Sequence, residues 1–153
     1  AGNEARIQAA IAQCNAPNNR TCMWRALEQA IGQATVGTPS EYWIVLLTDG
    51  DDTNSFEPAR TSRNAEEYDR GARTYCNERL LPTLRQCSEQ KRLAGFIAIT
   101  AGIEVSEETK AILRAMASAT GLPEAMIDCE KPEWLTKAFG QPAEIMNTAA
   151  GRM

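Results

Sequence analysis

Trp43-Ile44-Val45-Leu46-Leu47-Thr48-Asp49-Gly50 is the stretch of sequence that decides the fold. Its first five residues are continuously apolar and partly β-branched, and the run stops at the turn-forming residues Asp49 and Gly50. A short apolar run of this kind is typical of a parallel strand that is buried on both faces of its sheet. We therefore expect residues 43–47 to form such a strand, with Asp49 at its carboxyl end.

Two more strands and several helices are predicted around this stretch. Residues 95–100 repeat the buried-strand pattern, and residues 125–129 form a weaker third strand. Apolar residues at helical spacing predict a helix over 3–14, a helix capped by Thr21, a helical stretch over 65–92 with a kink or restart at Pro82, a helix capped by Ser106, and a last helix from Pro132 that Gly140 and Pro142 divide. Alternating strands and helices predict an α/β fold, with a doubly wound, Rossmann-like parallel sheet and helices on both faces.

The length of 153 residues predicts one domain over 1–153. Three strands are few for five or six helices, and two of those helices precede the first strand. Either the leading helices pack on strands that lie outside this sequence, or the sheet is small. We expect an incomplete domain, with a complementary segment or chain that completes the sheet.

Composition narrows the functional classes. The net charge is -4 and the pI is near 5.0, so the chain has no basic excess for nucleic acid. Its apolar runs are about strand length, far short of the roughly 20 residues of a membrane-spanning helix. A protein partner is expected instead. No secretory signal is visible at the start, and the compartment stays open with a slight lean to intracellular.

The five cysteines are Cys14, Cys22, Cys76, Cys87 and Cys129, and the sequence contains no histidine. No Cys-x-x-Cys pair is present, so a structural zinc site is not expected. Apolar neighbours such as Trp24 and Leu84 predict that several of these cysteines are small buried hydrophobic residues.

Three motifs resemble the von Willebrand factor A-type (vWA) domain. The strand ending in Thr48-Asp49-Gly50 is similar to the vWA strand that ends in Thr-Asp-Gly, and Arg20-Thr21-Cys22-Met23-Trp24-Arg25-Ala26-Leu27 is similar to the family segment that opens the preceding helix. The elements from residue 97 to the last helix also follow the family's order. Together the motifs resemble the C-terminal two-thirds of a vWA domain.

The resemblance implies a protein-binding module rather than an enzyme, with Mg²⁺ at the carboxyl edge of the sheet and an acidic residue offered by the partner. Thr21 and Asp49 correspond to two of the family's metal ligands, and we expect Asp51 and Asp52 to contact the partner. The family's Asp-x-Ser-x-Ser loop is absent from this sequence, and Arg20 replaces a family glycine. The Mg²⁺ site is therefore expected only if the missing loop is supplied elsewhere.

Two alternatives stay open. Asp49-Gly50-Asp51-Asp52-Thr53 also resembles the nucleophile motif of haloacid-dehalogenase phosphatases, in which Asp49 would be the nucleophile, Asp51 the general acid and base, and Thr100 a phosphate ligand. The segment Asp128-Cys129-Glu130 is a poor substitute for that family's acidic pair. The second alternative is a metal-independent structural subunit of a larger assembly, which an exposed apolar stripe on the first two helices would favour; its residues would be Ile7, Ile11, Trp24 and Ile31.

Overall fold

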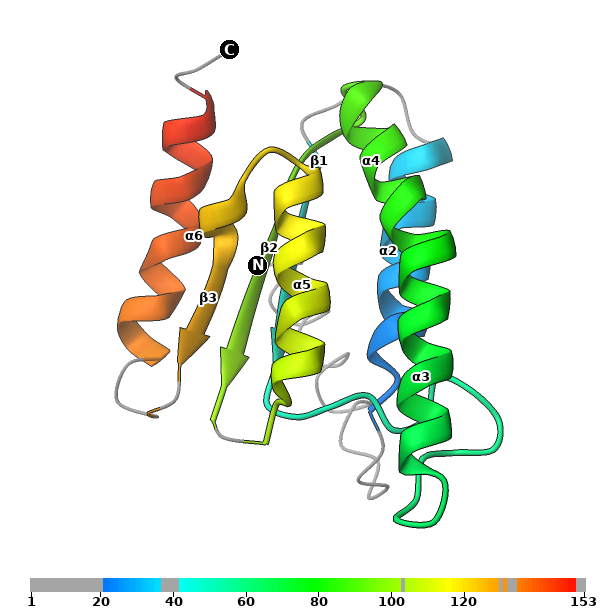
Figure 1. Ribbon diagram of the computed structural model, residues 1–153. Coiled ribbons are helices and arrows are strands. Elements are labelled where there is room, and N and C mark those ends of the chain that lie inside the picture. The colour runs from blue at the N-terminus through cyan, green and yellow to red at the C-terminus, as the bar shows by residue number, and fades with distance from the viewer. Residues whose placement is uncertain (1–20, 37–41, 103, 130, 132–134, 151–153) are drawn as a thin grey trace, which may run out of the picture.

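The computed structural model describes residues 21–36, 42–102, 104–129, 131 and 135–150. Within these ranges three parallel strands form one sheet in the order β1 (Tyr42–Thr48), β2 (Leu93–Ala101) and β3 (Met126–Cys129). The register places Leu47 opposite Ile99, and Ile99 opposite Ile127. The carboxyl ends of the three strands therefore lie at one edge of the sheet (Figure 1). The predicted helix over 3–14, with Ile7, Ile11 and Cys14, lies outside the described residues, as do Arg20 and Trp134.

Helices cover both faces of this sheet. One face carries α2, α3, α4 and α5, and α6 lies on the other face beside β2 and β3 (Figure 1). The helical segments are α2 (Met23–Val36), α3 (Ala65–Tyr75), the π-helix η1 (Cys76–Leu80), α4 (Leu81–Glu89), α5 (Glu107–Ala119), the 3-10 helix η2 (Pro123–Ala125) and α6 (Leu135–Ala150). The predicted α/β fold with a parallel sheet is confirmed.

The connection from β1 to β2 runs through α3, η1 and α4. Pro82 has no N–H group, and in a helix interior its ring would clash with a carbonyl one turn earlier. Here the helix widens into the π-turn Cys76–Leu80 and restarts at Leu81, so that Pro82 falls in the first turn of α4. The predicted restart at Pro82 is confirmed: the π-turn ends just before Pro82, and a new α-helix begins there.

The core lies on both faces of β2, between this strand and the helices that cover it. Phe96, Ile97 and Ile99 of β2 are at most 1% exposed. The predicted stripe of α2 is also buried, with Trp24 and Ile31 each 2% exposed. These two residues pack in the core of this chain, so they do not form the exposed apolar stripe that would favour the structural-subunit alternative.

β1 departs from the prediction that it is buried on both faces. Its even-numbered side is buried at Ile44 (8% exposed) and Thr48 (6%), but on the other side Val45 is 47% and Leu47 is 50% exposed. Within the described ranges β1 pairs only with β2, and α6 packs on β2 and β3 instead of covering it. The prediction was wrong because no element of the described chain covers the face of β1 on which Val45 and Leu47 lie.

The last helix also differs from its prediction. Gly140 and Pro142 were expected to split off a terminal piece, but α6 continues through both residues. Pro142 is buried, so apolar contacts of its ring offset the hydrogen bond that it cannot donate. None of the helices in the described ranges is long and apolar enough to cross a membrane.

Candidate functional site

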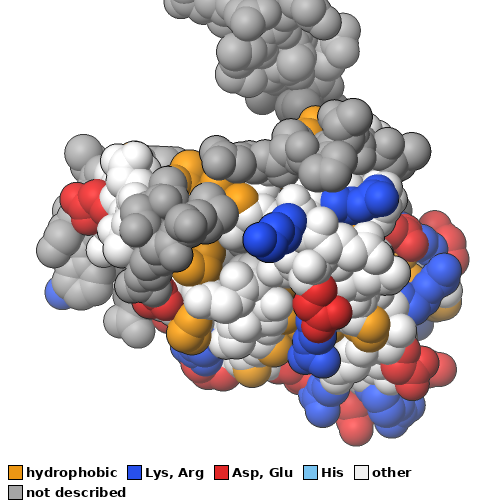
Figure 2. Space-filling view, turned by 90° about the horizontal axis from the view of Figure 1, so that it is seen from above, with side chains coloured by type: hydrophobic (Ala, Val, Ile, Leu, Met, Phe, Trp, Pro, Cys, Tyr) orange, Lys and Arg blue, Asp and Glu red, His pale blue; other side chains and the backbone are white. Residues whose placement is uncertain are grey.

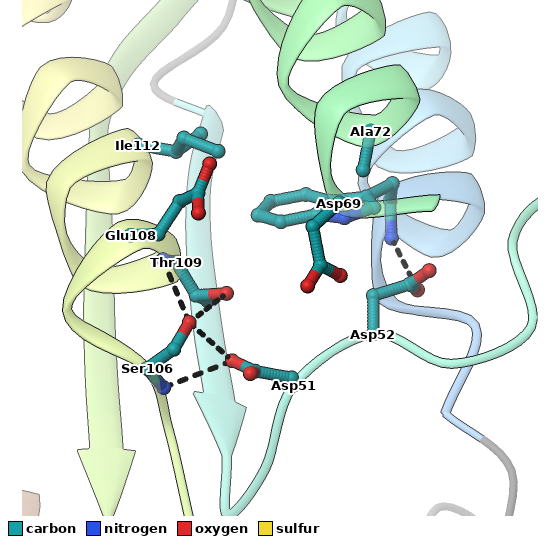
Figure 3. A pocket seen from close by; sticks show the side chains of 9 residues that line it. Asp51, Asp52, Asp69, Ala72, Ser106, Glu108, Thr109 and Ile112 are labelled. Atoms are coloured by element: carbon teal, nitrogen blue, oxygen red, sulfur yellow. Dashed lines mark hydrogen bonds between the residues drawn. The ribbon is translucent and has the colours of Figure 1, made fainter. Parts of the chain in front are cut away.

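The candidate site lies at the carboxyl end of β1, where the loop of residues 49–55 passes between α2, α3 and the start of α5 (Figure 3). A cavity of about 20 Å³, enough for one water molecule, opens there beside Trp24. Its acidic lining residues are Asp51, Asp52, Asp69 and Glu108. Open α/β sheets commonly place their binding sites at this edge.

Asp52 is the centre of a buried network and is only 3% exposed. Its Oδ1 accepts hydrogen bonds from the Trp24 N–H (3.3 Å) and the Ser55 hydroxyl (2.6 Å). Its Oδ2 accepts from the Ser55 N–H (3.2 Å) and from the Tyr68 hydroxyl (2.5 Å). Burial, reinforced by the hydrogen bond to Asp52, raises the pKa of Tyr68 well above its ordinary value, so Tyr68 stays a proton donor to the carboxylate. The predicted partner contact of Asp52 would therefore require this network to open.

The same loop caps α2, which corrects the expectation that Thr21 caps it. The first-turn N–H groups of Trp24 and Arg25 donate to Asp52 Oδ1 and Ser55 Oγ (3.2 Å). A carboxylate at a helix N-terminus is favoured both by these unpaired N–H groups and by the helix dipole. A loop that follows β1 thus supplies the cap that sequence reasoning placed next to the helix.

Arg25 fastens the loop from the outside. Its Nε donates to the Ser55 carbonyl (3.1 Å). Its guanidinium carbon lies 5.6 Å from the ring centroid of Phe56 and 5.4 Å from that of Tyr75, within the range of cation–π attraction. The loop, α2 and the end of α3 are therefore tied together.

Asp51 connects the loop to α5. Its Oδ1 accepts hydrogen bonds from the N–H and from the hydroxyl of Ser106, both 3.0 Å long. The Ser106 hydroxyl in turn accepts from the Thr109 N–H (3.2 Å), which confirms Ser106 as the predicted helix cap. Asp51 is thus engaged within the chain, although its contacts lie at the exposed rim of the cavity.

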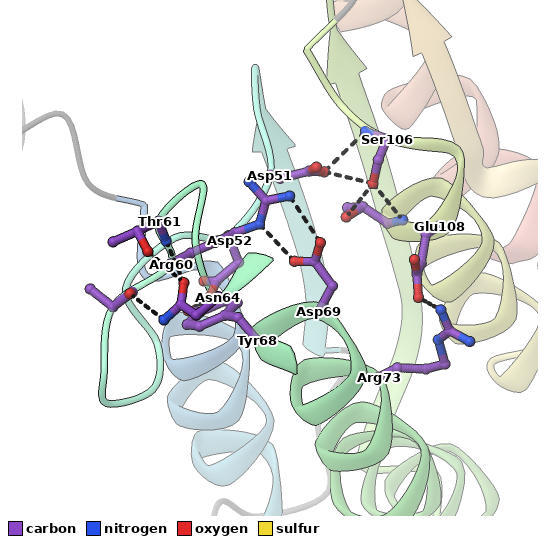
Figure 4. A network of polar contacts seen from close by, with 12 residues as sticks. Asp51, Asp52, Arg60, Thr61, Asn64, Tyr68, Asp69, Arg73, Ser106 and Glu108 are labelled. Atoms are coloured by element: carbon purple, nitrogen blue, oxygen red, sulfur yellow. Dashed lines mark hydrogen bonds and ion pairs between the residues drawn. The ribbon is translucent and has the colours of Figure 1, made fainter. Parts of the chain in front are cut away.

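The other two carboxylates of the cavity are neutralised by arginines (Figure 4). Asp69 accepts a two-pronged hydrogen bond from Arg60, with Nε at 2.7 Å and Nη2 at 2.9 Å. Glu108 pairs with Arg73. The cavity is acidic in composition, but each of its four carboxylates already has a partner from the protein.

Thr21 and Asp49, the two predicted metal ligands, both lie near this edge. The Thr21 carbonyl accepts hydrogen bonds from the N–H groups of Thr53 and Asn54, each 2.9 Å long. This places Thr21 against the loop that Asp49 begins. Asp49 is exposed and has no hydrogen-bond or ion-pair partner in the described chain.

The donor set does not make a magnesium site on its own. Mg²⁺ prefers six oxygen ligands in near-octahedral geometry, and Thr21 and Asp49 provide two side-chain oxygen groups. Among the described residues no group of three or more His, Cys, Asp or Glu side chains is arranged to hold a metal. A complete site would need further ligands from outside the described chain.

A second polar cluster, which sequence reasoning missed, lies at the carboxyl ends of β2 and β3. The amine of Lys110, which is 5% exposed, lies 2.7 Å from Asp128 Oδ2 and 3.2 Å from Glu107 Oε1. The hydroxyl of the fully buried Thr100 donates to Asp128 Oδ1 (2.8 Å). Lys110 precedes Leu113 by three residues and so lies on the apolar stripe of α5. This position in the sequence could have predicted that the lysine is buried.

Four of the five cysteines lie in the described ranges, and none of these four forms a disulfide. Cys76, Cys87 and Cys129 are at most 3% exposed, which confirms the predicted burial of several cysteines, while Cys22 is exposed. Burial, with a contribution from the charge of Asp52, raises the pKa of Cys76 to about 12. A thiol with such a pKa stays protonated and is a poor nucleophile.

Comparisons with protein-family models, curated proteins and solved structures find no match for this chain. On the face shown in Figure 2, Lys and Arg side chains lie among Asp and Glu side chains rather than in one basic patch.

Proposed function

We propose that this chain is a protein-interaction module with a vWA-like organisation, whose sheet is completed at the free edge of β1 by a hydrophobic strand from a complementary segment or chain outside this sequence. The observation that carries this proposal is the unpaired edge of β1 together with its exposed face at Val45 and Leu47. A strand that is apolar along its whole length suits a central position, yet Val45 and Leu47 are about half exposed.

The energetics favour an occupant at this edge. Unpaired N–H and C=O groups on an edge strand are a template for another strand, and natural edges are commonly protected by charged residues or proline. β1 has neither between Tyr42 and Thr48. Covering the exposed halves of Val45 and Leu47 would contribute about 1–2 kcal/mol together, in addition to backbone pairing. A hydrophobic strand fits this edge better than a polar one.

The motif resemblance supports the vWA-like reading of the same edge. Asp49 begins the loop after β1, Thr21 contacts that loop, and the strands and helices that follow keep the family's order. The strands that would carry Asp-x-Ser-x-Ser in this family belong next to β1. The missing strand and the missing metal ligands therefore point to one location. We place partner binding at this side of the molecule, with Asp49 as its most available carboxylate.

The phosphatase alternative finds less support in the site. That chemistry requires the nucleophile, the threonine and the cation to converge on one phosphate. Thr100 lies opposite Thr48, beside Asp49, but its hydroxyl donates to Asp128. Lys110 also binds Asp128, on β3, which β2 separates from β1. The structural-subunit alternative shares the completed sheet and differs only in needing no Mg²⁺.

Substitution of Val45 and Leu47 by lysine tests the proposal in two settings. In the 153-residue chain alone, V45K/L47K is expected to change the free energy of unfolding by less than about 1 kcal/mol, because both side chains reach solvent. In the native protein the same pair is expected to cost at least about 3 kcal/mol, because the part of the added segment that crosses this face of the sheet would bury both lysines. Urea unfolding of both proteins measures the difference.

Ile44→Lys is the matched control, since Ile44 is buried beneath α2 and the neighbouring helices in either setting. It is expected to destabilise both proteins strongly. An equally small effect of V45K/L47K in the two settings would show that the face of β1 at Val45 and Leu47 stays uncovered. This result would refute the proposal.

A further inference from the structure

The sheet has a second edge, at β3. Within the described chain β3 pairs with β2 alone, and α6 lies next to it on the face opposite α5 (Figure 1). β3 has four residues, Met126–Cys129, and its outer backbone groups are free to accept a further strand.

An open groove of about 420 Å³ lies between β3 and α6. Its apolar lining comes from Met126 and Ile127 of β3 and from Ile145 of α6. Met126 and Ile145 are partly exposed and pack against the edge of the core. The volume lies within the roughly 300–1,000 Å³ of ordinary binding pockets.

The groove has an acidic rim. Glu124 lies in η2 just before β3, Glu144 lies on α6, and Asp128 lies near the carboxyl end of the strand. The charge of Asp128 is balanced by Lys110. Glu124 and Glu144 are exposed, and neither carboxylate has a hydrogen-bond or ion-pair partner in the described chain. None of the groove's lining side chains that the structure describes is a lysine or an arginine.

We propose that this groove binds an extended peptide segment in which a lysine or arginine is flanked by hydrophobic residues, and that the segment adds a strand to the free edge of β3. Backbone pairing with β3 supplies affinity, as in other strand-addition complexes. Successive side chains of a strand point to opposite faces of the sheet. The hydrophobic residues of the segment therefore pack against Met126 on the α5 face, while its cation lies beside Glu144 on the α6 face, with Glu124 adding to the attraction. Like charges on the rim repel an acidic segment, so the rim selects for basic partners.

This proposal is independent of the occupant of β1, because the two edges are separated by β2. The probe is a fluorescein-labelled, acetylated and amidated pentapeptide Lys-Val-Lys-Val-Lys, titrated with the chain while fluorescence anisotropy is recorded. We expect saturable binding that weakens as salt rises. The double variant Glu124→Gln/Glu144→Gln is expected to weaken it by about tenfold.

Two controls separate this site from general attraction to an acidic protein. The peptide Glu-Val-Glu-Val-Glu is expected not to bind. Glu66→Gln/Glu67→Gln removes the same two charges from the exposed start of α3 and is expected to leave affinity unchanged. NMR should show perturbed amides across Met126–Cys129. Absence of saturable binding, an equal loss in the α3 variant, or unperturbed β3 amides would overturn the proposal.

Discussion

Replacement of Asp52 by asparagine is expected to lower the free energy of unfolding by about 3 kcal/mol. Asp52 is 3% exposed and accepts four hydrogen bonds, two of which come from Ser55. The amide keeps one acceptor but turns an NH₂ group toward donors that the carboxylate had satisfied. The substitution also removes the negative charge that caps α2, which adds to the loss.

Asp49→Asn is the matched control, because it makes the same chemical change three residues earlier at an exposed position without a partner. It is expected to change the free energy of unfolding by less than about 0.5 kcal/mol. Urea unfolding measured by circular dichroism compares the two. If D52N were as stable as D49N, the buried network around Asp52 would not be what holds the loop and α2 together.

Lys110→Met is expected to cost about 3 kcal/mol, because it leaves the Asp128 carboxylate without its cation. Asp128→Asn should cost somewhat less, since the Lys110 ammonium, 5% exposed, then keeps only the exposed carboxylate of Glu107 as its partner. In the double variant neither charge is left alone, so much of the loss should be recovered. Lys91→Met, at an exposed position, is the control and should be nearly neutral. Additive losses in the double variant would contradict a coupled pair.

The same pair predicts how stability depends on pH. Burial opposes ionisation of Asp128, but hydrogen bonds from Lys110 and Thr100 outweigh it and lower its pKa. Asp128 therefore stabilises the fold above the ordinary carboxyl pKa of about 3.9, and this contribution is lost as the pH falls through the lower pKa of the folded state. The hydrogen bond to Asp128 raises the pKa of Lys110. Its contribution is present below about pH 10.4 and is lost as the pH rises through the folded value.

Unfolding measured from pH 2 to pH 7 should accordingly show a shallower acid dependence for K110M than for the unsubstituted chain. In the variant Asp128 no longer gains from Lys110 when it ionises. Identical acid dependence in the two proteins would mean that the ion pair does not contribute to folding.

The fold was largely predictable because its signals are local. The apolar run over 43–47 and the helical stripe of Trp24 and Ile31 each specify an element without reference to distant residues. Pro82 and Ser106 also acted locally, as a helix restart and a helix cap. The predicted break at Pro142 was wrong, because a proline interrupts a helix only when tertiary packing does not hold the helix together.

The polar site was harder to predict because its contacts join residues far apart in the sequence. Asp52 caps a helix that begins 29 residues earlier, at Met23, and it reads in sequence as one more acid in a solvated loop. Lys110 finds Asp128 only after α5 and β3 are packed together. Thr21 and Asp49 both lie near the carboxyl end of β1, and their role as metal ligands stays a prediction. The sequence could not show that the neighbouring acids are already engaged.

The most direct test of the central claim is hydrogen–deuterium exchange of the β1 backbone amides, measured in the native protein and in the 153-residue chain alone. A completed sheet predicts that in the native protein the amides of Tyr42–Thr48 are protected as strongly as those of Leu93–Ala101. In the chain alone, the β1 amides that face the free edge should exchange rapidly. Equally fast exchange of these amides in both proteins would contradict the account, since it would show that no strand covers β1.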